Sequence, residues 1–258
     1  MKLSRFIDLV VVFSSSMSLL FAILLLTSGY RHGVLNKLAI AQYTYNLNST
    51  AAFPTSNSNS SLNPASTSPI LTPQEVTDGI HWWVFTVHYL SICAGYVGGS
   101  PTPVNVFLEC EKKPAGYTFR TDDPFIVNFQ REGSLVLVEP IPLDVIDTKA
   151  PFLMLVLGMG FLVLGLGLLG LQWCGMVNTL LPLLFISPAL IFMLTSSVLI
   201  TSITSQRKMR NGYSNWVGSF LGLTWASVGF LCAAFMGKVV DLLRQRQDKR
   251  RLRRMGEL

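Results

Sequence analysis

Four long stretches of this chain are almost free of charge, and this pattern constrains the fold more than any other feature. The stretches cover residues 9–30, 151–171, 180–201 and 216–239. About 20 helical residues cross the ~30 Å hydrocarbon core of a bilayer. Because lipid offers no partner to backbone N–H and C=O groups, a spanning stretch has to be helical. The sequence therefore predicts four transmembrane helices.

The second and third stretches have to be separate helices. One helix from Pro151 to Thr201 would be about 75 Å long at 1.5 Å per residue, more than twice the thickness of the hydrocarbon core. The more polar residues 172–178 are the place where the chain can turn. Pro182 and Pro188 predict a kink near the start of the third helix.

The charge distribution fits a membrane protein. Half of the 258 residues are apolar and 13% are charged, against about a quarter in an ordinary soluble domain. The net charge is +6, and eight of the twenty basic residues lie between Lys238 and Arg254, directly after the last apolar stretch. This placement favours the anionic membrane lipids of the inner leaflet as a partner. It does not favour nucleic acid.

Basic residues close to the spans predict the orientation. Residues 1–8 carry Lys2 and Arg5, and the tail at residues 240–258 is strongly basic, so both termini are expected in the cytoplasm. The loop at residues 202–215, with three basic residues, then lies outside against this trend. The first stretch could instead be a cleaved signal peptide, but its length and the lack of an Ala-x-Ala site favour a retained helix.

The long outer loop, residues 31–150, divides by composition. Residues 46–73 are rich in Ser, Thr, Asn and Pro and carry no charge, which is typical of a disordered stalk. Two Asn-x-Ser/Thr sequons begin at Asn48 and Asn59, and we expect both asparagines to be glycosylated.

The rest of this loop, residues 80–141, predicts a small antiparallel sheet. Short runs alternate apolar and other residues, as strands with one buried face do. Gly- and Pro-containing turns separate the runs. The runs are Phe85–Tyr89, Val104–Leu108 and Phe125–Phe129, with Ser134–Ile141 as a further candidate.

Four cysteines fall into two groups. Cys93 and Cys110 lie in the outer loop, where an oxidising compartment favours a disulfide across the first predicted hairpin, worth about 3 kcal/mol. Cys174 and Cys232 lie at or inside the membrane stretches and suit packing or lipidation better than a bridge.

Motifs that would indicate catalysis, metal binding or cofactor binding are weak in this sequence. Residues 165–170 match Gly-x-Gly-x-x-Gly, but they lie in a membrane stretch with no strand before them, so a packing surface is the better interpretation. His81 and His88 would point to opposite faces of a strand, which argues against a shared metal ion. We see no nucleophile–base pair and no ionisable residue at mid-membrane depth. We therefore expect no catalytic site, metal or cofactor.

Two features suggest contacts. Gly218, Gly222 and Ala226 are spaced i, i+4 and i+8, which lets another helix approach closely; packing within the bundle is favoured and a homo-oligomer is the alternative. The basic tail could be a topogenic anchor or could recognise phosphoinositide or phosphatidylserine at about 1 kcal/mol per basic residue. Its candidate lipid-binding residues are Arg244, Arg246, Lys249, Arg250, Arg251, Arg253 and Arg254.

The fourth stretch also carries a family resemblance. Gly222-Leu223-Thr224-Trp225-Ala226-Ser227-Val228 resembles the Gly-x-x-Trp-Ala-Ser-Val stretch of the fungal Sur-seven/PalI family of claudin-like plasma membrane proteins. Supporting residues are Thr27-Ser28-Gly29 and the aromatic segment from Trp82 to Cys93. The resemblance adds Trp225 and Ser227 to the residues expected in helix packing. This chain departs from the family in its longer Ser/Asn-rich stalk and its brief tail.

The resemblance implies a four-helix transmembrane bundle with a small antiparallel outer sheet, located in eisosome-associated domains of the plasma membrane. It implies other membrane or cortical proteins as partners, and roles in membrane organisation and cell-wall integrity. A component of ambient pH sensing, as in the PalI branch, is one alternative. A channel or calcium-influx regulator, suggested by similar four-span fungal mating proteins, is another.

Overall fold

Four long helices dominate the computed structural model, which describes residues 2–28, 38–46, 82–98, 104–120, 122–127, 145–207 and 218–255. Each of the four is long and apolar enough to cross a membrane, which confirms the predicted number of membrane-length helices. They are α1 (Lys2–Thr27), α4 (Lys149–Trp173), α5 (Leu180–Arg207) and α6 (Gly218–Met255).

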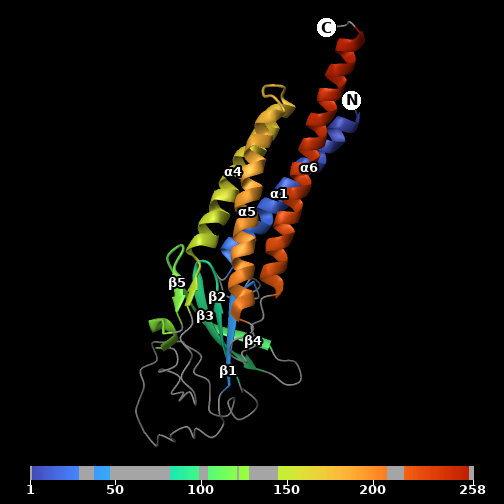
Figure 1. Ribbon diagram of the computed structural model, residues 1–258. Coiled ribbons are helices and arrows are strands. Elements are labelled where there is room, and N and C mark those ends of the chain that lie inside the picture. Colours follow the sequence, from blue (N-terminus) through green and yellow to red (C-terminus); the bar gives the residue numbers. More distant parts are fainter. Residues whose placement is uncertain are drawn as a thin grey trace, which may run out of the picture.

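The helices run up and down beside one another, with α1 next to α6 and α4 next to α5 (Figure 1). The sheet lies at one end of this bundle, here called the sheet end. Both chain termini lie at the opposite end, here called the termini end (Figure 1). Apolar side chains from all four helices fill the space between them.

Glycines allow the helices to approach closely. A Cβ atom on Gly158 of α4 would lie 2.6 Å from Met193 Cγ of α5, and one on Gly165 would lie 3.2 Å from Ile186 Cγ1. A Cβ atom on Gly237 of α6 would lie 2.7 Å from Val11 Cγ2 of α1. Within the Gly-x-Gly-x-x-Gly match, Gly165 thus allows close helix packing. A Cβ atom placed on Gly167 or Gly170 would meet no atom within 4 Å.

The predicted turn between the second and third spans is confirmed. α4 ends at Trp173, and Gly175 adopts a φ of +75°, a conformation that glycine reaches without the steric cost of a side chain. α5 begins at Leu180 and continues as one helix through Pro188.

The main sheet has four antiparallel strands in the order β1-β2-β3-β4. A separate two-stranded sheet pairs β5 with β6. Tyr43 of β1 stacks on Phe119 of β5, with ring centroids 5.3 Å apart, and the two sheets share one apolar core. The strands are β1 (Ala41–Asn46), β2 (Trp82–Val87), β3 (Ser91–Gly98), β4 (Val104–Lys112), β5 (Thr118–Arg120) and β6 (Val145–Asp147).

Several details of the predicted sheet were wrong. β2 ends at Val87, so Tyr89 lies in the following turn. Residues 124–127 form a helical turn, because the Asp123 side chain accepts a hydrogen bond from the Phe125 N–H at 3.0 Å and the Asp123 carbonyl accepts one from the Val127 N–H at 3.0 Å. Strands β1, β3, β5 and β6 were not predicted.

Other predictions lie outside the described residues. They include the two sequons at Asn48 and Asn59, nearly all of the stalk, His81 and the strand candidate at residues 134–141.

Candidate functional site

The turn after β2 joins the four-stranded sheet to the helix bundle. Tyr89 in this turn is fully buried. Its ring meets Phe152 of α4 edge-on, with centroids 5.7 Å apart, and Phe220 of α6 at 5.8 Å. Edge-to-face aromatic pairs of this kind add to the energy of burial. Tyr89 therefore anchors the sheet on two helices at once.

His88 forms the polar part of the same joint. Its Nδ1 lies 3.1 Å from the Leu38 carbonyl oxygen and 3.4 Å from the Ser28 hydroxyl at the end of α1. Its Nε2 lies 3.2 Å from the Thr86 hydroxyl. Burial lowers the pKa of His88 to about 4, so the ring is neutral near pH 7. His88 thus links α1, the segment before β1 and β2.

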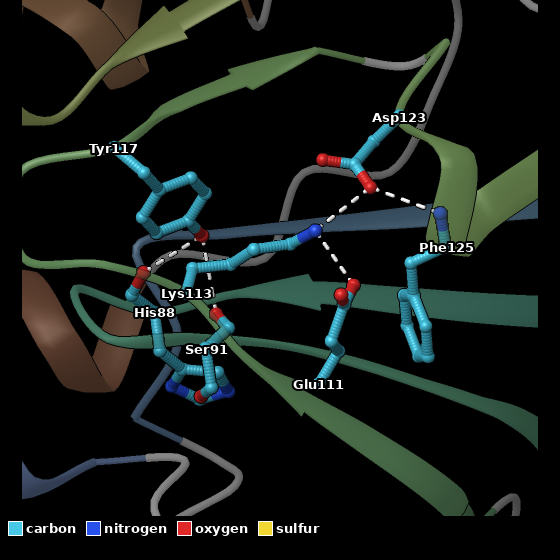
Figure 2. A network of polar contacts seen from close by, with 7 residues as sticks. All are labelled: His88, Ser91, Glu111, Lys113, Tyr117, Asp123 and Phe125. Carbon is cyan, nitrogen blue, oxygen red and sulfur yellow. Dashed lines mark hydrogen bonds and ion pairs between the residues drawn. The ribbon is translucent and has the colours of Figure 1, made fainter.

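Tyr117 holds this turn from the other side. Its hydroxyl lies 2.9 Å from the His88 carbonyl oxygen and 3.1 Å from the Ser91 carbonyl oxygen, and it donates to this pair (Figure 2). Burial, reinforced by the nearby Asp123 carboxylate, raises the pKa of Tyr117 above its ordinary range. The hydroxyl therefore stays a donor at every physiological pH.

Lys113 extends this polar network. Its backbone N–H donates to the Leu90 carbonyl at 2.8 Å. Its ammonium lies 2.9 Å from Asp123 Oδ1 and 2.6 Å from Glu111 Oε2 (Figure 2). Partial burial alone would lower the pKa of Lys113, but the hydrogen bonds and attraction from these two carboxylates raise it overall. The network fixes the chain after β4 against the turn that carries Tyr89.

The disulfide between Cys93 and Cys110 is confirmed. The two residues are direct partners in the β3–β4 register, and 17 positions separate them along the chain. The other two cysteines, Cys174 and Cys232, are free thiols with exposed side chains, as expected.

At the termini end, a buried ion pair joins three helices. The Lys238 ammonium of α6 lies 2.6 Å from Asp8 Oδ1 of α1 and 3.0 Å from Gln172 Oε1 of α4. Two turns further along α6, the Gln245 side chain accepts a hydrogen bond at 2.9 Å from Thr179, which lies between α4 and α5.

Sequence analysis missed this cluster, because it left Asp8 in the N-terminal segment at residues 1–8 and counted Lys238 with the basic residues of the tail. A usable signal was present. Lys238 lies between Gly237 and Val239, at the end of an apolar stretch, and a lone cation in that position needs a partner inside the bundle.

The predicted packing residues of α6 divide into two sets. The Ser227 hydroxyl donates to the Ser18 carbonyl of α1 at 2.9 Å, and the two hydroxyls lie 3.0 Å apart. Trp225 Nε1 donates to the Thr201 hydroxyl of α5 at 3.2 Å. Gly222, in contrast, meets nothing within 4 Å and Ala226 is half-buried. At Gly222 the space beside the helix is therefore open within the described residues, whereas Ser227 faces α1.

The basic tail continues α6 without a break as far as Met255. Arg244 is half-buried, and the basic residues that follow it are exposed where their side chains are described, namely Arg246, Lys249, Arg250, Arg251 and Arg253. Gly218 is the first residue of the helix, and the side chain of Arg254 lies outside the described part.

Comparisons with protein-family models and with curated proteins found no match. The resemblance to the Sur-seven/PalI family therefore rests on the quoted residues alone. Within the described ranges, no group of three or more His, Cys, Asp and Glu side chains could hold a metal ion. The structural features that could serve a function are thus a sheet anchored on a helix bundle, a buried ion pair and a basic helical extension.

Proposed function

We propose that this protein is a non-enzymatic scaffold of plasma membrane domains, with the sheet outside the cell and both termini in the cytoplasm. The observation that carries the proposal is the joint at His88 and Tyr89. Through it, a disulfide-closed outer sheet is fixed to three of the four helices. Such a body presents an outer surface to the wall or to other proteins at a constant position above the membrane.

The interior of the bundle supports a scaffold over a channel. Leu162 of α4, Ile186 of α5 and Leu231 of α6 are completely buried and belong to one apolar cluster that also includes α1. Polar side chains buried beside this cluster, such as Ser18, Ser197 and Ser227, bond to one another or to helix carbonyls. An ion pathway needs polar groups that face a water-filled channel instead.

The outward face of α6 supports lateral association. Gly222 and Gly229 lie seven residues apart, and a Cβ atom placed on either one would meet no atom within 4 Å. Small residues on a lipid-facing surface let another helix approach closely. We assign this face to contacts with other membrane proteins or a second copy of the chain.

Imaging of a fluorescently tagged protein in the cell membrane tests the scaffold role. We expect immobile patches that recover slowly after photobleaching. Gly222→Leu/Gly229→Leu should disperse them, because the bulky side chains block close helix contact. Gly167→Leu/Gly170→Leu is the matched control, since these glycines of α4 also meet nothing within 4 Å.

Uniform, freely mobile fluorescence of the unmodified protein would contradict the scaffold role. Growth loss confined to alkaline pH in a deletion strain would point to pH sensing instead. Ion flux in reconstituted vesicles that loop mutations abolish would point to a channel or its regulator.

A further inference from the structure

The last turns of α6 carry a basic face. Arg246, Lys249, Arg250 and Arg253 are spaced i, i+3, i+4 and i+7, so they share one side of the helix, and all four side chains are exposed. Asp248 falls on the opposite side by the same spacing. We call these four residues the basic face.

The basic face begins where α6 leaves the bundle and extends away from it. Lys238 marks the level at which the polar side chains of α1 and α4 meet α6, and Gln245 reaches the turn between α4 and α5. Arg253 follows Lys238 by 15 residues, which is roughly 22 Å of helix at 1.5 Å per residue. Figure 1 shows this part of α6 projecting past the other helices.

With the edge of the hydrocarbon core at the predicted end of the fourth span, residue 239, this projection would carry most of the basic face beyond the lipid headgroups. The headgroup layer adds only about 5–7 Å on each side of the hydrocarbon core. Even at a tilt of about 40°, near the upper limit for membrane helices, Arg253 would stand about 17 Å above the core. The remaining gap exceeds the Debye length of about 8 Å at physiological salt. The anionic leaflet is thus a poor partner for the far end of this face.

We propose that the basic face docks an acidic helix of a cytoplasmic protein. Carboxylates at i, i+3, i+4 and i+7 of such a helix match its four cations over two turns. Arginine pairs with carboxylates through two parallel hydrogen bonds, which gives orientation as well as attraction. This docking contact would give the scaffold proposed above a class of partner. It rests on that proposed function for the cytoplasmic location of the tail.

The test uses the full-length protein in phosphatidylcholine nanodiscs. The probe is a fluorescent alanine-based helical peptide with glutamates at i, i+3, i+4 and i+7. We expect binding that weakens as salt is raised. Arg250→Ala/Arg253→Ala should weaken binding by about tenfold, because two ion pairs are lost. Arg244→Ala/Arg251→Ala removes the same charge from the opposite side of the helix and should change affinity by less than about threefold.

Three results would overturn the proposal. One is no binding of the peptide, and another is an equal loss in both double variants, which would indicate net charge alone. The third is loss of peptide binding when phosphatidylserine is added to the nanodiscs, which would assign the face to the membrane. Because the assay needs no membrane patches, its failure is distinguishable from a failure of the scaffold role.

Discussion

At the scale of single residues, Lys238 shows how much one buried side chain can contribute to the stability of a helix bundle. Its side chain is almost completely buried and bonds to both Asp8 and Gln172. Removing one partner of a buried ion pair leaves an uncompensated charge, whereas replacing both partners by neutral groups is much milder.

A double-mutant cycle tests the Lys238–Asp8 pair. We expect Asp8→Asn alone to lower the free energy of unfolding by about 3 kcal/mol, because Lys238 stays buried without its carboxylate. Asp8→Asn/Lys238→Met should lose clearly less than the sum of the single changes. The measurement is the unfolding transition in detergent, with the exposed Asp248→Asn as control. Additive losses would show that the two charges are not coupled.

His88 predicts a pH dependence of stability. Its pKa is about 4 in the folded protein and 6.5 in a model compound, because burial disfavours the charged ring. Between these values the unfolded chain binds a proton that the folded protein does not. The free energy of unfolding should therefore fall as pH drops from about 6.5 to about 4, by about 3 kcal/mol in all.

Thermal unfolding of the purified protein across this pH range measures the effect. His88→Gln should flatten the curve relative to the unmodified protein. Equal pH slopes for the unmodified protein and His88→Gln would refute the assignment.

The role of His88 could not be predicted from the sequence. It was interpreted as a surface or sheet histidine, yet its partners Leu38 and Ser28 lie 50 and 60 positions away along the chain. Only tertiary packing brings them together. The disulfide was predictable, because two outer-loop cysteines leave a single pairing.

At the scale of elements, the helices were far more predictable than the strands. Hydropathy over about 20 residues locates a membrane helix without knowledge of its neighbours. β3 contains Ala94, Gly95 and Gly98, which are poor strand formers, and it pairs only because β2 and β4 flank it. The run beginning at Phe125 alternates like a strand but starts two residues after Asp123, whose side chain caps a helical turn.

The pairing of β3 with β4 gives an element-scale prediction. Cys93→Ala/Cys110→Ala should destabilise the outer sheet by about 3 kcal/mol, because the unfolded loop regains its freedom. Limited proteolysis of the membrane-embedded protein should then cut within the sheet and leave the helices intact. Cys174→Ser/Cys232→Ser is the control, since both free thiols are exposed. Equal protease resistance with and without the Cys93–Cys110 bond would contradict this prediction.

At the scale of the whole molecule, α1 behaves as a member of the bundle. It contributes Asp8 to the buried ion pair and Ser18 to the hydrogen bonds with Ser227. Cleavage after α1 would leave Lys238 buried without its carboxylate, which argues for retention.

We therefore expect the mature protein to keep α1. Its intact mass should include residues 2–28, and tags at the two termini should be accessible from the same side of the membrane. The Cys93–Cys110 sheet should be accessible from the other side. A mature chain that starts after about residue 30 would show cleavage and would rule out the four-helix assembly in the cell.

Because α6 is one unbroken helix, a tilt at one end of it displaces the other end. Phe220 touches Tyr89 of the outer sheet, and the helix contains no proline before it reaches Arg253, about 50 Å away at 1.5 Å per residue. A rod of this length that tilts by about 5° at one end moves its other end by about 4 Å. In the proposed orientation, mechanical load on the sheet would thus reach the cytoplasm as a sideways displacement of the arginines, with no ligand or chemical step in between.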